Sequence, residues 1–188
     1  LDNLTSFEGS ASLGDMVFIS SATASSSASI EFSLGSYKEY KFFFVNMHPS
    51  VDSVSFSFNF STDNGSNYNV VKTSTNFNAQ HNEADTEALL TYDAGGDLAQ
   101  SSAIQKISRG IGNGSDESGS GYLSVFNPSS STFVKHYIGS MNFYISTNSS
   151  ANPFVAGYAN TTSPLTNIKF QMDSGNIDEG KILMFGIN

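Results

Sequence analysis

Residues 53–61 read Ser-Val-Ser-Phe-Ser-Phe-Asn-Phe-Ser, an unbroken alternation of polar and apolar side chains. Successive side chains of a β-strand point to opposite faces, so this pattern predicts a strand with Val54, Phe56, Phe58 and Phe60 on one face. The glycine turn at 63–66, Asp-Asn-Gly-Ser, follows directly. We expect the chain to return there along residues 68–75 and form a β-hairpin.

The same style of sequence recurs along most of the chain. Short alternating segments with turn residues between them predict an all-β, antiparallel β-sandwich of jelly-roll type with about nine to eleven strands. The expected strands cover residues 16–20, 29–34, 38–46, 53–61, 68–75, 104–111, 122–126, 133–147, 154–159, 168–172 and 181–187. A short helix is expected at 98–104. The glycine-rich stretch 112–121 is interpreted as the loop of a hairpin between the strands on either side of it.

The chain has 188 residues, enough to bury a substantial core in one domain. We therefore interpret 1–188 as a single β-sandwich domain, with 1–15 as an extended N-terminal arm. The predicted core consists of apolar residues on the inward faces of the strands: Phe32, Phe42, Phe44, Val54, Phe56, Phe58, Phe60 and Phe170. Segments 38–46 and 181–187 carry apolar residues on both faces, which is typical of a central strand or of a subunit contact.

Charge excludes several classes of function. The formal net charge is −9, and Arg109 is the only arginine. Such a surface cannot neutralise a row of phosphates, so neither nucleic acid nor an anionic membrane is an expected partner. There is no cysteine, which excludes disulfides, thiolate metal sites and cysteine nucleophiles. No apolar run is long enough to span a membrane, so no membrane insertion is expected.

Two groups of residues carry chemistry in principle. His81, Glu83 and Asp85 share one parity, so on an extended strand they would face the same way as candidate metal ligands. The alternative is a solvated acidic loop, and we predict no metal and no cofactor. Asp93 and Asp97 flank a Gly-Gly pair and could serve as the paired carboxylates of a glycosidase, although Asp in such turns usually bonds to the backbone.

The remaining binding candidates are polar residues in loops. Asn113, Asp116 and Glu117 lie in the glycine-rich stretch, and with Asp93 and Asp97 they make segments 78–102 and 112–121 the expected ligand contacts. No nucleophile motif of the Gly-x-Ser-x-Gly type occurs, and His136 is interpreted as a strand residue. No catalytic residue is predicted.

Several phrases occur in an order that resembles a known family. They include Phe18-Ile19-Ser20-Ser21-Ala22-Thr23, Tyr37-Lys38-Glu39-Tyr40, Asn46-Met47-His48-Pro49 and Ala156-Gly157-Tyr158. The chain closes with the segments 174–182 and Phe185-Gly186-Ile187. Together these resemble the β-sandwich virion structural proteins, fibre-like or decoration-like, of marine tailed bacteriophages.

The resemblance implies a non-enzymatic structural protein located in the virion. The expected function is a surface-displayed tail-fibre module of the receptor-binding type, with other virion proteins and a host-surface glycan as partners. A homotrimer is expected by analogy. The alternative is a capsid decoration (cement) protein, and a more remote one is a polysaccharide depolymerase.

Overall fold

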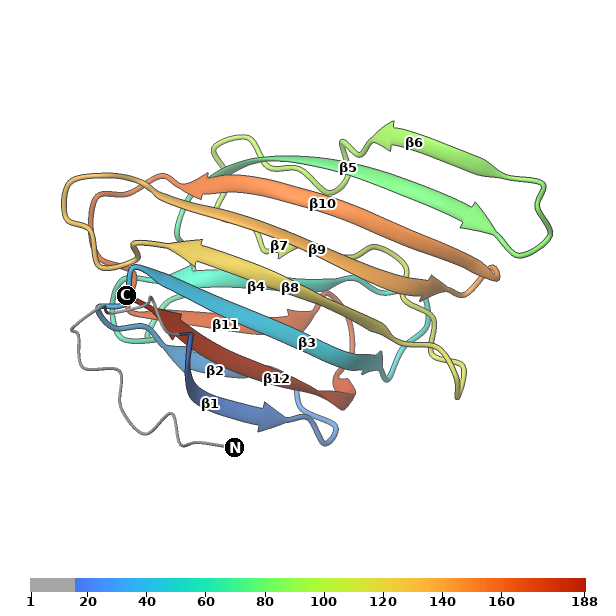
Figure 1. Cartoon of the computed structure of the whole chain (residues 1–188), viewed down its shortest axis with the longest axis horizontal. Helices are drawn as coiled ribbons and strands as arrows, with labels where there is room; N and C mark the ends of the chain where they lie inside the picture. Colours follow the sequence, from blue (N-terminus) through green and yellow to red (C-terminus); the bar gives the residue numbers. More distant parts are fainter. Residues whose placement is uncertain (1–15) are drawn as a thin grey trace, which may run out of the picture.

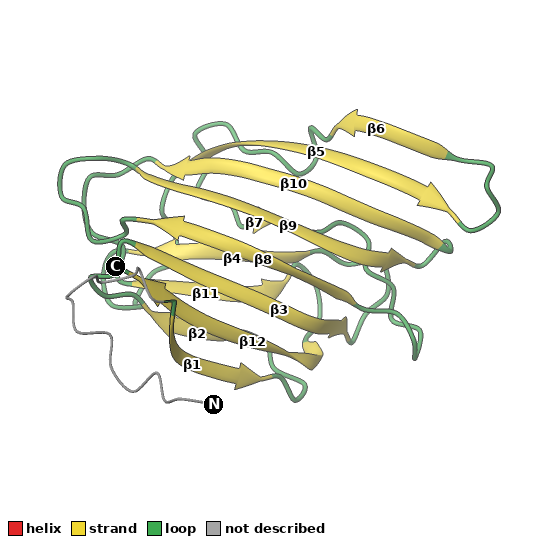
Figure 2. Cartoon of the chain, in the orientation of Figure 1, coloured by secondary structure: helices red, strands yellow, loops and turns green. Residues whose placement is uncertain are grey.

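The computed structural model describes residues 16–188, and the expected arm at 1–15 lies outside them. The described chain is all-β, with strands, loops and no helix (Figure 2). Twelve strands form an eight-stranded and a four-stranded antiparallel sheet, which confirms the all-β sandwich and is one strand above the predicted range. The strands are β1 (Val17–Thr23), β2 (Ile30–Ser33), β3 (Glu39–Pro49), β4 (Phe56–Ser61), β5 (Lys72–Asn82), β6 (Ala88–Tyr92), β7 (Gln105–Lys106), β8 (Gly119–Phe126), β9 (Lys135–Ile145), β10 (Ser149–Ala159), β11 (Asn167–Met172) and β12 (Ile177–Ile187).

Eight of these strands have the connectivity of a jelly roll. The large sheet has the order β1-β12-β3-β8-β9-β10-β5-β6 and the small sheet has the order β2-β11-β4-β7. Apart from β5, β6, β9 and β10, the strands pair from the two ends of the chain inward: β1 with β12, β2 with β11, β3 with β8 and β4 with β7. This is the pairing of one long hairpin rolled into two sheets.

The other four strands extend the large sheet on one side. Strands β5 and β6 are inserted between β4 and β7 of the roll, and β9 and β10 are inserted between β8 and β11. In space they continue the large sheet beyond β8 in the order β9-β10-β5-β6. The small sheet ends at β7, so the large sheet extends past its edge (Figure 1). This extension decides where the molecule has a concave surface.

A single apolar cluster fills the space between the sheets. All eight core residues expected from the sequence are buried in it. Phe170 of β11 lies at its centre, with ring centroids 5.1 Å from Phe42 and 5.2 Å from Phe44. Tyr137 of β9 packs edge-on to Phe58 at 5.2 Å and joins the extension to the same core.

The hairpin expected at 53–75 is wrong. Strand β4 pairs with β11 and β7 in the small sheet, whereas β5 pairs with β10 and β6 in the large one. Both edges of β4 are therefore occupied, and the chain after the turn at Asn64-Gly65 crosses to the other sheet. Turn residues specify a change of direction, but not the strand with which the chain next pairs.

The Ser/Asn face of β4 is buried as well as its Phe face. Asn59 is 3% exposed, and its amide nitrogen donates to the carbonyl oxygens of Tyr68 and Ser102 at 2.7 and 3.0 Å. The buried ammonium of Lys72 donates to Asn59 Oδ1 and to the Val70 carbonyl. This face is thus an internal polar network that connects β4 to the crossing segment.

Two smaller predictions are also wrong, because local sequence does not specify the strand with which a segment pairs. Residues 98–104 form no helix, because their backbone groups bond to β5 at Lys72 and Ser74. The glycine-rich stretch does not close a hairpin, since β7 and β8 belong to different sheets. Segment 133–147, by contrast, contains one continuous strand, β9, that passes through Gly139.

Close packing between β8 and β9 gives a prediction about Gly121. A Cβ atom at Gly121 would lie 2.2 Å from the Ser140 carbonyl oxygen and 2.6 Å from Met141 Cα, both backbone atoms. We expect Gly121→Ala to lower the free energy of unfolding by about 1–3 kcal/mol, because the strands would have to move apart. Urea denaturation measures this. Gly114→Ala is the control, since its Cβ would meet only the partly exposed side chain of Glu117 and no backbone atom; equal effects would contradict the prediction.

Candidate functional site

The extension of the large sheet leaves an open cleft of about 450 Å³ beside the small sheet. Its floor is the inner face of β5, β6, β9 and β10, and its wall is formed by the residues at the ends of β4, β7 and β11. The lining residues are Ser53, Ser55, Asn78, Gln80, Leu89, Thr91, Tyr92, Asp93, Lys106, Arg109, Gly110, Phe143, Ile145, Pro153 and Asp173. This volume lies in the range of small-molecule sites.

Strand register explains which side chains form the floor. Asn78 of β5 stands opposite Thr91 of β6 and Pro153 of β10, and Gln80 stands opposite Leu89. Residues directly opposite each other in an antiparallel pair share a face, so these side chains point to the same side of the sheet. The small sheet ends before it reaches them, and they therefore line the cleft instead of the core.

Two ion pairs border the cleft. Arg109 and Asp93 form one, and their side chains are 49% and 14% exposed. Lys106 Nζ lies 3.5 Å from Asp173 Oδ2, and Asp173 Oδ1 accepts from the backbone N–H of Ser55 at 2.8 Å. Partly exposed pairs of this kind contribute little to stability. They do place fixed donors and acceptors where a ligand could reach them.

The floor also holds a free hydrogen-bond acceptor. Asn78 Oδ1 is buried and has no donor among the described residues, and Asn76 Oδ1 further along β5 is in the same state. A buried carbonyl oxygen without a donor costs about 1–3 kcal/mol. Asn78 lines the cleft, so a ligand hydroxyl or N–H could satisfy its oxygen there.

The structure separates the two candidate acids of a glycosidase. Asp93 is held in the cleft by Arg109 and by the N–H of Gly95. Asp97 does not line the cleft and accepts instead from the Tyr92 hydroxyl at 2.5 Å, a bond that raises the pKa of Tyr92. Asp93 and Asp97 are thus engaged with different partners and do not flank a common space.

The expected common face of His81, Glu83 and Asp85 does not exist. Strand β5 ends at Asn82, and the chain then turns, with Asp85 in the left-handed region at φ 55°. His81 Nε2 lies 3.2 Å from Asp85 Oδ1, whereas Glu83 accepts from the Tyr144 hydroxyl at 3.0 Å. Within residues 16–188, no three His, Asp or Glu side chains are grouped so that they could hold a metal ion.

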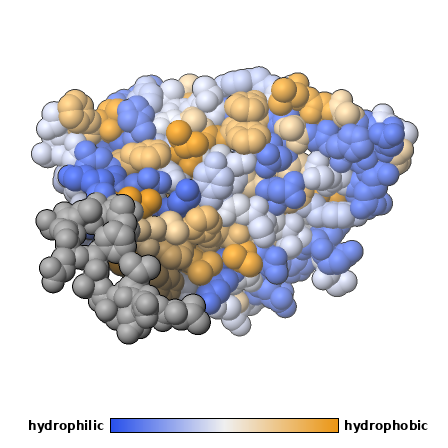
Figure 3. Space-filling model, in the orientation of Figure 1, coloured by the Kyte–Doolittle hydropathy of each residue, from blue (hydrophilic) through white to orange (hydrophobic). Residues whose placement is uncertain are grey.

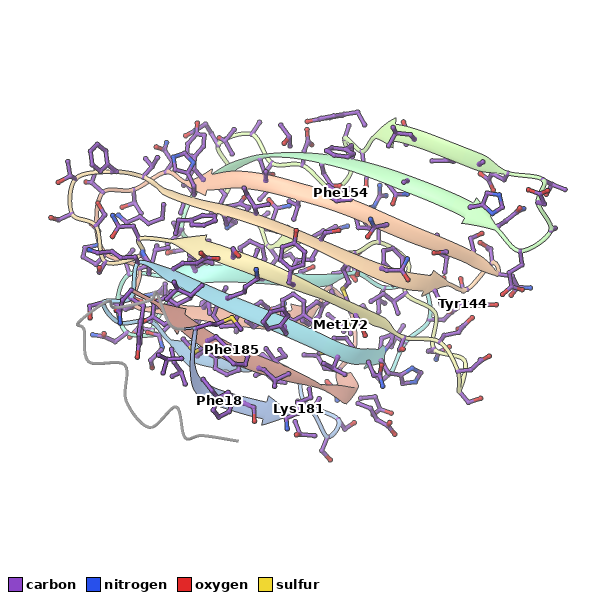
Figure 4. All side chains as sticks on the ribbon, viewed as in Figure 1. Phe18, Tyr144, Phe154, Met172, Lys181 and Phe185 are labelled. Carbon is purple, nitrogen blue, oxygen red and sulfur yellow. The ribbon has the colours of Figure 1, made fainter. Side chains whose placement is uncertain are left out.

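Tyr144 lies between two acidic loops. Its hydroxyl receives the negative field of Glu83, Asp116 and Glu117, and the hydrogen bond to Glu83 does most to raise its pKa. Figure 4 places Tyr144 at the end of the molecule where the β5–β6 turn and the 112–118 loop project. The Glu117 side chain closes that loop by accepting from the N–H of Gly114, and the Asn113 N–H donates to Asp52. These loop candidates therefore form an acidic tip apart from the cleft.

Asp93 is the one cleft residue that the sequence singled out by itself, although the expected contact segment 78–102 also contains Asn78, Gln80, Leu89, Thr91 and Tyr92 of the lining. The others lie in strands or just beyond strand ends, where a polar side chain resembles an ordinary surface residue. Only Arg109 carried a signal, as the single arginine of the chain.

The chain matches no protein-family model, no curated protein and no solved structure. In the part of the chain that the structure describes, no helix is long and apolar enough to cross a membrane.

Proposed function

We propose that this protein is a non-enzymatic virion structural protein of a tailed bacteriophage, displayed on a tail fibre, whose cleft binds a host-surface glycan. The observation that carries the glycan proposal is the composition of the cleft. Arg109 and Lys106 supply donors, and Asp93, Asp173 and Asn78 supply acceptors.

The apolar residues of the cleft could contact the C–H faces of a sugar ring. Leu89, Phe143, Ile145 and Pro153 present hydrocarbon surface beside the polar groups. A pyranose has hydroxyl groups around its rim and C–H groups on its faces, so it needs both kinds of contact. A mixed cleft with moderate charge fits such a neutral or weakly charged ligand better than it fits a nucleotide.

The ligand is tested with an array of immobilised bacterial surface polysaccharides. We expect wild-type protein to bind a subset of them and Arg109→Ala to bind that subset at least about tenfold more weakly, the loss typical of a charged hydrogen-bond donor. Lys169→Ala is the control, since Lys169 lies on β11 against Tyr68 and does not line the cleft. Thermal unfolding checks that both variants fold. Binding to no polysaccharide, or equal binding by Arg109→Ala, would overturn the glycan proposal.

The place in the virion needs a separate experiment. Gold-labelled antibodies against the protein should decorate the tail fibres of intact particles. Label spread over the head shell would favour the alternative of a capsid decoration protein. Shortening of a bound polysaccharide during incubation would instead favour a depolymerase.

The proposed homotrimer would use the other half of the large sheet. Its outer face carries Phe43 on β3, Phe185 on β12 and Phe18 on β1, with ring centroids 5.5 and 5.6 Å apart between neighbours. Figure 4 shows Phe18 and Phe185 together on this side of the molecule. Aromatic clusters of this kind are typical of subunit contacts.

A further inference from the structure

The outer face of the extension carries a row of apolar residues. Tyr92, Phe77 and Phe154 stand opposite one another across β6, β5 and β10, and Ile138 of β9 lies one row away. The Phe77 and Phe154 rings stack at 5.1 Å and are 44% and 40% exposed. Figure 3 views this face and shows orange groups spread over it. A soluble sheet normally presents polar residues on its outer face, so these rings indicate a contact surface.

This face also lacks formal charge. The outward positions of five neighbouring strands, β8, β9, β10, β5 and β6, contain no Lys, Arg, Asp or Glu. The chain as a whole carries 17 acidic and 8 basic residues. Two copies at −9 each repel, and they can approach most easily where no carboxylates oppose one another.

A groove lies on the same face beside the stacked rings. It has a volume of about 390 Å³ and is lined by Thr73, Ser74, Thr75, His136, Tyr137, Ile138, Ala156, Gly157 and Tyr158. The ring of Tyr158 packs against His136 and forms one wall. The small residues Ala156 and Gly157 make the floor, two to three positions along β10 from Phe154.

The protruding rings and the groove are therefore neighbours on one surface. A two-fold axis that lies between the large sheets of the two copies, parallel to them and at right angles to the strands near Ala156, would place the Phe77–Phe154 pair of each copy over the groove of the other. Contacts of this isologous kind bury the same patch on both partners.

We propose that two copies of this chain pair through the outer face of β5, β9 and β10, with Ala156 beside the two-fold axis. This contact is distinct from the β1–β12–β3 surface of the proposed trimer and from the glycan cleft on the inner face. It depends on neither of them.

Cysteine cross-linking tests the pairing directly, because the chain has no native cysteine. We expect Ala156→Cys treated with a short bis-maleimide to run mainly as a covalent dimer on a denaturing gel. Ser150→Cys is the matched control on the same strand and face. It lies six residues away, roughly 20 Å along the strand, so its two copies would be roughly 40 Å apart across the axis and should remain monomeric. Equal cross-linking of the two variants, or none of Ala156→Cys, would overturn the proposal.

Sedimentation gives a second measurement that needs no cross-linker. Phe154→Glu places a carboxylate on each side of the contact and should lower the self-association constant at least about tenfold. Phe133→Glu is the control, since Phe133 is 69% exposed in the loop before β9. Arg109→Ala should pair normally, which keeps this result separate from the glycan experiment. Unchanged association of Phe154→Glu would contradict the proposed contact.

Discussion

Phe170→Ala is expected to lower the free energy of unfolding by about 3–5 kcal/mol, the range for an aromatic side chain removed from a rigid core. Phe170 is fully buried at the centre of β11, where β11 pairs on both edges. Its ring is in contact with five others, those of Phe32, Phe42, Phe44, Phe56 and Phe58.

The large loss of stability expected for Phe170→Ala depends on which strands carry the five neighbouring rings. The five rings belong to β2 and β4 of the small sheet and to β3 of the large sheet. Each is held by its own strand ladder, so none can move far enough to fill the space that Phe170 leaves. Phe133→Ala is the matched control and should change stability by less than about 0.5 kcal/mol, because Phe133 is exposed. Guanidinium denaturation of both variants measures the difference; a loss below 1 kcal/mol for Phe170→Ala would contradict the rigid-core interpretation.

The second large effect is a rise in stability with pH that depends on Lys72. Burial lowers the pKa of the Lys72 ammonium from 10.5 to about 7. Between these two values the unfolded chain binds more protons than the folded chain, so the free energy of unfolding increases with pH. The destabilisation is fully present below pH 7 and disappears as the pH approaches 10.5.

The expected gain between pH 7 and pH 9.5 is about 3 kcal/mol, since one proton difference changes the free energy of unfolding by about 1.4 kcal/mol per pH unit. The carbonyl oxygens of Asn59 and Val70 accept hydrogen bonds from the Lys72 ammonium and offset part of this gain. Above pH 10 the unfolded chain begins to lose tyrosine protons that the buried Tyr137 retains, because burial raises the pKa of Tyr137. The measurement therefore stays below pH 9.5.

Lys72→Met separates this effect from the other titrating groups. Methionine keeps the length of the side chain without the amine, so the curve of stability against pH should be flatter than that of the wild type. Burial also lowers the pKa of Lys135, which contributes with the same sign but is present in both proteins. Lys169→Met, at a partly exposed site, should keep the wild-type slope. Parallel curves for the wild type and Lys72→Met would show that Lys72 titrates in the folded protein as it does in water.

The sequence reached the fold class because the class depends on local alternation. Each segment such as 53–61 or 168–172 records which of its side chains are apolar, and two-residue periodicity is sufficient to identify a strand and its inward face. The core residues follow from the same pattern. Their burial does not depend on which strand lies alongside.

Pairing could not be read from the same pattern. The Asn64-Gly65 turn has the composition of a hairpin turn, yet β4 and β5 lie in different sheets. What separates them is competition: β11 and β7 occupy both edges of β4, and β10 offers β5 a longer ladder. Which strands pair depends on the free energy of the whole fold, and the sequence of either segment alone does not show it.

By itself, the sequence determined an acidic, sparsely charged, cysteine-free, all-β chain with an aromatic core, because composition and period-two alternation are properties of each segment. Only the tertiary structure decided that four inserted strands extend one sheet beyond the other. That overhang turns Asn78, Asp93 and Arg109 into the lining of a single cleft and leaves Phe77, Phe154 and Ile138 on an uncovered face. The physical reason is that a cleft and a contact face are made by residues distant in the chain. Their proximity is fixed by strand order and register, and not by any single stretch of sequence.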